Sequence, residues 1–90
     1  MGTNIEKIIQ RQKEKELSDF RALLQEAHRW QQAKMMRDYI SEVEAKAIAN
    51  SKVSEELKSW LVWARKKADW LDPTMKTEDE LLKNMDTNSL

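Results

Sequence analysis

The chain has 90 residues, of which 36% are charged, and its 16 basic and 16 acidic side chains cancel. With no Cys and one His, a disulfide scaffold, a thiolate metal site and a multi-histidine cluster are excluded. No apolar run is long enough to span a membrane, and the first residues lack the basic and apolar regions of a signal peptide. The neutral charge balance argues against a dedicated polyanion binder. We therefore expect a cytoplasmic, helix-rich interaction module.

Glycine and proline, which interrupt regular structure, occur once each. Breaks are therefore expected only at Gly2, over residues 50–54 and at residues 72–74. The segments between them are rich in Glu, Lys, Gln, Ala, Leu and Met, which favour helices. Because no segment has the alternating pattern of a strand, the sequence predicts an all-α fold.

The N-terminal region of the chain carries one apolar stripe at helical spacing. Its residues are Ile5, Ile9, Phe20, Leu24 and Ala27. A wholly polar run over residues 11–16 interrupts this stripe. We therefore expect residues 1–16 to form a charged helical extension, and the packed domain to cover 17–86, with residues 87–90 as a frayed tail.

A second stripe follows in a different phase: Ala33, Met36, Ile40, Val43 and Ala47. Continuing the first stripe would require apolar residues at positions 31 and 34, where the chain has Gln and Lys. This shift favours a tight turn near residues 28–30 between helices over 17–29 and 31–49. One uninterrupted helix from 4 to 49 is the alternative.

A third helix is expected over residues 54–71. Ser54 can cap its N-terminus, and Asp72 before Pro73 ends it. Thr77 and Glu80 have the spacing of a capping box, which indicates a short further helix toward Met85. The expected architecture is thus a small three-helix bundle with an N-terminal helical extension and a short C-terminal helix.

Two acidic residues near the end of the third helix have structural interpretations. Asp72 is expected to form an Asx-type turn, and Asp69 to pair with Arg65 or with Arg37 on a facing helix. Residues 51–71 carry five basic and three acidic groups, whereas residues 72–90 carry two and five. This asymmetry predicts that the acidic tail docks against the basic third helix.

No group of residues has the pattern of a catalytic site. His28 has no nucleophile or carboxylate at a useful spacing, and we interpret it as a histidine in a turn or at a helix end. The acidic pairs lie in expected first helical turns, where they interact with the helix dipole. There is no glycine-rich phosphate loop. We expect no enzyme activity, no cofactor, no metal and no small-molecule substrate.

The four tryptophans are the strongest compositional signal for a function. Trp63 and Trp70, two turns apart, lie beside the main apolar face of the third helix. They either complete the intramolecular core or, with Lys67, form a surface for a protein partner. Ile5, Ile8 and Ile9 on the extension are the candidate dimer surface, because an isolated amphipathic helix is marginally stable. The favoured function is non-enzymatic protein–protein interaction or self-association.

The alternative is a nucleic-acid-associated accessory domain, in which Trp63 and Trp70 stack on bases while Arg65, Lys66 and Lys67 contact phosphates. Acidic residues nearby in sequence oppose this function.

Two resemblances add to these patterns. The ending Trp60-x-x-Trp63-Ala64-x-x-x-Ala68-Asp69-x-x-Asp72-Pro73, preceded by Ala27-x-x-Trp30-x-x-Ala33, resembles the C-terminal helical domain of larger uncharacterised bacterial proteins. That resemblance, over roughly residues 17 to 85, implies a C-terminal piece of a longer protein and carries no assigned activity. Residues 30–44 have a weaker local similarity to the UVR helical-hairpin motif of nucleotide excision repair proteins, which implies shared hairpin geometry. The second alanine of that motif is absent.

Overall fold

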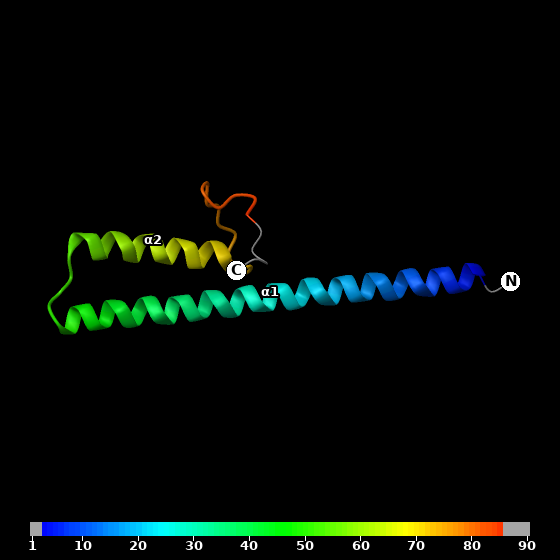
Figure 1. Cartoon of the computed structure of the whole chain (residues 1–90), viewed down its shortest axis with the longest axis horizontal. Helices are drawn as coiled ribbons and strands as arrows, with labels where there is room; N and C mark the ends of the chain where they lie inside the picture. The colour runs from blue at the N-terminus through cyan, green and yellow to red at the C-terminus, as the bar shows by residue number, and fades with distance from the viewer. Residues whose placement is uncertain (1–2, 86–90) are drawn as a thin grey trace.

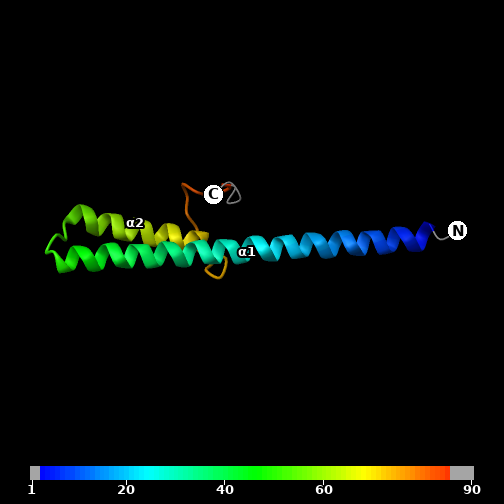
Figure 2. The same ribbon diagram turned by 60° about the horizontal axis from the view of Figure 1, so that its bottom comes forward.

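The chain forms a hairpin of two very unequal helices. The computed structural model describes residues 3–85, in which α1 spans Thr3–Ala49 and α2 spans Glu55–Leu71. Helix α2 returns antiparallel to the C-terminal half of α1, and the N-terminal half of α1 continues alone (Figure 1). The view turned by 60° gives the same arrangement (Figure 2). Within the described residues there is no strand, so the predicted all-α class is confirmed.

The predicted three-helix bundle is wrong. Residues 17–29 and 31–49 belong to one helix of 47 residues, so the alternative of a single helix is confirmed. The Cα radius of gyration is 20.4 Å, whereas a compact domain of this length has one of about 12 Å. The physical reason is that residues 25–32 contain no helix breaker, so the apolar stripe changes face along α1 without a turn.

The loop between the helices begins with a Schellman-type cap. The amide of Lys52 donates to the carbonyl of Ala47 and that of Ser51 to the carbonyl of Ile48. Ser51 has a φ of 54°, the left-handed conformation that glycine usually supplies at this position. The predicted break over residues 50–54 is thus confirmed.

Helix α2 has the predicted ends. The Ser54 hydroxyl accepts a hydrogen bond from the amide of Leu57 at 3.0 Å, and Glu55 and Glu56 occupy the first turn. Asp72 is the C-cap in an extended conformation, immediately before Pro73. These signals are local in sequence, which is why they position the helix correctly.

The core between the helices is small and contains several alanines. Its buried apolar residues are Ala33, Ile40, Leu61, Ala64, Ala68 and Leu71. Met36, Leu57 and Trp60 pack against the region of this core around Ile40. Short side chains on both helices let the backbones approach closely, so this pair of helices buries little apolar area for its length.

The short helix predicted toward Met85 is not present. Residues 80–84 form turns, and Asn84 has a φ of 66°. The side chain of Asp79, and not that of Thr77, accepts a hydrogen bond from a following amide, that of Leu81. A segment this short does not form a stable helix without strong packing. The tail predicted to fray, 87–90, lies outside the described residues.

Among the described residues, neither helix combines the length and the apolar character needed to cross a lipid bilayer.

Candidate interaction surfaces

The N-terminal half of α1 projects from the hairpin with every side chain exposed. We call residues 4–28 the extension; the first half-buried side chain after it is that of Arg29. The expectation that packing begins at Leu17 is therefore not met. His28 lies within the helix and is exposed, so its assignment to a turn is wrong.

The extension carries large apolar side chains on one face. We call this set the extension stripe: Ile5, Ile9, Phe20, Leu23 and Leu24. Ile5 is 65% exposed and Phe20 is 60% exposed. Ile8 and Leu17 flank the stripe and are also exposed. Single exposed apolar residues are ordinary on protein surfaces, but a stripe on an unsupported helix indicates a binding face.

The extension stripe points away from α2. Buried Ala33 and Ile40, with Met36, define the face of α1 that α2 covers. At 3.6 residues per turn, the extension stripe lies roughly 150° around the helix from that face. If α2 were longer and continued in its present direction, it would therefore not cover the extension stripe. Helix α1 thus has two apolar faces, of which the hairpin uses one.

Charge is unevenly distributed along the extension. Residues 4–15 carry four basic and two acidic side chains, whereas residues 16–28 carry one basic and three acidic side chains. The N-terminal segment therefore has a net charge of +2, and the segment that follows it has a net charge of −2. The net charge of the extension therefore changes from positive to negative along the helix axis, and this favours one orientation of a charged partner.

The second candidate surface lies on α2. Trp63 is 55% exposed, and Lys67 lies over its ring at 5.7 Å from the centroid. Lys67 also pairs with Asp79, and the side chains of both residues are largely buried. Trp70 is half-buried and lines a shallow pocket with residues 77–80, 83 and 84. The predicted docking of the acidic tail is confirmed at this point, and it covers some of the Trp70 surface.

An ion pair also engages a second of the three consecutive basic residues Arg65, Lys66 and Lys67. Arg65 donates to Glu44 of α1 at 3.0 Å. Since Lys67 is paired as well, two of these three consecutive cations are bound by carboxylates within the chain. Trp30 lies in the middle of α1, where a turn was expected near residues 28–30, and 47% of its surface is exposed.

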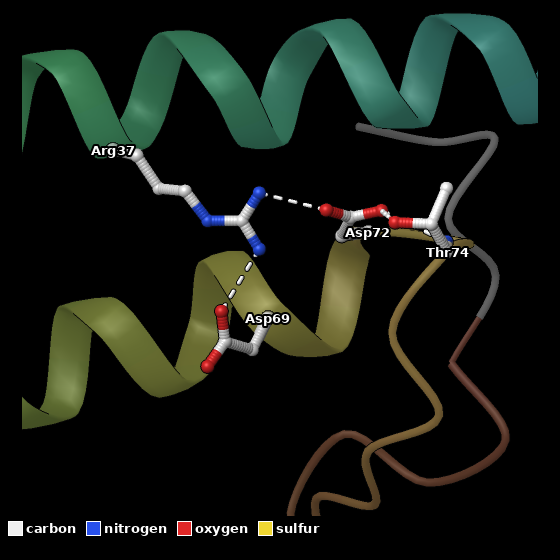
Figure 3. A network of polar contacts seen from close by, with 4 residues as sticks. All are labelled: Arg37, Asp69, Asp72 and Thr74. Atoms are coloured by element: carbon white, nitrogen blue, oxygen red, sulfur yellow. Dashed lines mark hydrogen bonds and ion pairs between the residues drawn. The ribbon is translucent and has the colours of Figure 1, made fainter.

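Arg37 connects the two helices at the end of α2 (Figure 3). Its guanidinium donates to Asp69 at 2.8 Å and to Asp72 at 2.7 Å. Of the two partners predicted for Asp69, Arg37 is the one that binds it, whereas Arg65 pairs with Glu44. The same Arg37 guanidinium also binds Asp72, a contact that the sequence did not suggest. Because Asp72 is only 3% exposed, its negative charge needs a nearby cation, and the Arg37 guanidinium supplies one.

Asp72 also forms the predicted Asx turn. Its other carboxylate oxygen accepts hydrogen bonds from the amide and the hydroxyl of Thr74, at 2.8 and 2.7 Å. The Thr74 hydroxyl and the Arg37 guanidinium lower the pKa of Asp72 from 3.8 to about 2. The cluster therefore fixes the end of α2 against α1.

No group of three His, Cys, Asp or Glu side chains within residues 3–85 comes together as metal ligands would. In comparisons with known proteins, no family model, no curated protein and no solved structure matches the chain.

Proposed function

We propose that this chain is a non-enzymatic helical module that associates with a protein, either a second copy of itself or another chain, through the extension stripe. The observation that carries the proposal is a stripe of large apolar side chains on a helical segment, residues 4–28, in which every side chain is exposed. Isolated helices are marginal in water, since tertiary packing of the apolar face supplies most helix stability. A partner on the stripe would supply that packing.

The ionisable groups support a structural role for the rest of the chain. The carboxylates with a lowered pKa, Asp72 and Asp79, are each bound to a cation on a helix. Their pKa shifts come from these ion pairs and from hydrogen bonds of turns, which is how structural carboxylates behave. Nothing in this arrangement favours acid–base catalysis.

Trp63 is a second candidate contact for a protein, because an exposed indole beside a paired lysine resembles the anchors of known interfaces. The nucleic-acid alternative has weaker support, because Arg65 and Lys67 are engaged by carboxylates. From the sequence resemblance alone, we also propose that the module belongs to the C-terminal region of a larger bacterial protein. From the composition of the sequence, we propose that it acts in the cytoplasm.

Sedimentation equilibrium tests self-association, the form of the proposal that needs no further component. We expect a mass that rises with concentration from the monomer value of 10.7 kDa toward twice that value. Hydrogen exchange of the amides of residues 4–28 should slow in parallel, because a covered helix opens less often. A chain that stays monomeric up to about 1 mM, with unprotected amides in the extension, would contradict self-association.

A further inference from the structure

The face that carries the extension stripe includes Leu23, Ala27 and six residues whose order reads the same in both directions. These six lie at spacings of four, four, three, four and four: Ile5, Ile9, Lys13, Glu16, Phe20 and Leu24. At 3.6 residues per turn they fall within roughly 100° of arc. Two apolar residues thus flank an opposite-charge pair on each side, and the midpoint lies between residues 14 and 15.

We infer that the extension pairs with the extension of a second copy in antiparallel orientation, with residues 14 and 15 at the two-fold axis. Ile5 then lies opposite Leu24 of the second copy, and Ile9 lies opposite Phe20. At the centre, Lys13 lies opposite Glu16, twice by symmetry. A contact related by a two-fold axis must be self-complementary in this way. The inference rests on the proposed function and specifies its partner and orientation.

The polar run over residues 11–16 has a role in this arrangement. On a lone helix it only interrupts the stripe, but in the antiparallel pair its Lys13 and Glu16 form the central charged layer. Polar residues at such positions fix the register of paired helices, because a shifted register leaves them beside apolar residues.

The charge distribution selects the same orientation. In the antiparallel pair, the segment with net charge +2 lies against the segment with net charge −2 at both ends. A parallel pair places like charges together along the whole extension, which is unfavourable.

This register keeps the contact within the uncovered part of α1. Among the described residues, the pairing extends from residue 3 of one copy to residue 26 of the other. The first half-buried residue of the hairpin, Arg29, comes three residues after this point. The overlap is therefore confined to the stretch of α1 that the hairpin leaves uncovered. Because α2 lies on nearly the opposite face, it does not obstruct the second copy.

Fluorescence energy transfer between singly labelled copies tests the orientation. The chain has no Cys, so Asn4→Cys and Gln25→Cys each give one labelling site, and both positions are exposed and lie off the stripe. In the antiparallel pair, position 4 lies level with position 25 of the other copy, whereas two copies of position 4 are roughly 30 Å apart along the axis. We expect stronger transfer between positions 4 and 25 than between positions 4 and 4.

Charge reversal tests the register. Lys13→Glu should weaken association by about tenfold, and adding Glu16→Lys should restore it, because the opposite-charge layer is re-formed. Lys7→Glu is the matched control: it makes the same change of net charge at an exposed position off the stripe, and should have a smaller effect. Circular dichroism shows whether the variants keep the same helix content.

The possible results distinguish the antiparallel register from self-association itself. Association with stronger transfer between two copies of position 4, or with no effect of Lys13→Glu, overturns the antiparallel register and leaves self-association intact. A chain that shows no transfer in any mixture and sediments as a monomer overturns both the antiparallel register and self-association.

Discussion

The Phe20→Ser variant should weaken self-association about 100-fold. Phe20 is the largest side chain of the extension stripe, and it is 60% exposed in the single chain. Serine and phenylalanine have similar helix propensities, so the substitution removes apolar surface from the stripe with little direct effect on the helix.

The magnitude follows from the area that association would cover. An aromatic side chain offers about 200 Å², so the exposed area of Phe20 is roughly 120 Å². At about 25 cal/mol per Å², complete burial would contribute roughly 3 kcal/mol per copy, or roughly 6 kcal/mol for a symmetric pair. One neighbouring helix covers about half of such a side chain. The expected loss is therefore about 3 kcal/mol, which corresponds to about two powers of ten in Kd.

Sedimentation equilibrium of the two chains over the same concentration range measures this loss. Ala22→Ser is the matched control, because Ala22 is exposed on the face of α1 away from the stripe. Its substitution lowers helix propensity more than that of Phe20 does, so a general weakening of the helix would affect the control more. Equal association of wild type and Phe20→Ser, or equal losses in both variants, would refute the assignment of the stripe as the interface.

Four further variants test the rest of the structure. Ile40→Ala should destabilise the hairpin by about 2–5 kcal/mol in urea unfolding, because Ile40 is one of the few large buried residues between α1 and α2. Asp72→Asn should be less stable than wild type at pH 5 and should converge with it as the pH falls toward 2. The stabilisation that the Asp72 carboxyl contributes is complete above its pKa in the unfolded chain, 3.8. It is lost as the pH falls through its pKa in the folded chain, about 2. Asp79→Asn should shift the indole NMR signal of Trp70 toward that of a solvent-exposed ring, since it removes the contact with Lys67 that holds the segment beside Trp70. Gln31→Pro should break α1 between the extension and the hairpin, leaving α2 packed while the helix content of residues 4–28 falls.

The ends of α2 and the contacts around Asp72 could be predicted from the sequence because their causes are local. Ser54 caps the amide three residues later, and Asp72 accepts from the residue two positions later. The pairing of Asp69 with Arg37 is a long-range contact. It could nevertheless be predicted as one of two alternatives, because a partly buried acidic residue at a contact between helices needs a cation nearby.

The course of α1 could not be settled from the spacing of its apolar residues. A change of phase in an apolar stripe has two physical causes: the chain turns, or the helix continues and presents a different face. Both leave the same pattern of residues. Propensity decides between them here, since residues 25–32 include no glycine or proline, and continuing the helix preserves hydrogen bonds that a turn would lose.

The prediction of a short C-terminal helix was wrong for a different reason: a tertiary contact outweighed a local sequence signal. Thr77 and Glu80 have capping-box spacing, but Asp79 is held by Lys67 of α2, and its side chain organises the following turn. The charge asymmetry of the sequence predicted the docking, although no local pattern indicated which acidic residue would make it.

The continuity of α1 links the two halves of the molecule energetically. Starting a helix is the unfavourable step, and each further residue adds one hydrogen bond at lower cost. Packing against α2 holds residues 33–40 in helical form, so the extension grows from an existing helix toward its N-terminus. Its helical order should therefore decrease from residue 28 toward residue 4 in a single chain. In the antiparallel pair, the least ordered end of each copy lies against the best ordered end of the other extension, so each hairpin supports the weak end of its partner. If the proposed pair forms, residues near position 4 should therefore gain more helical order on association than residues near position 28.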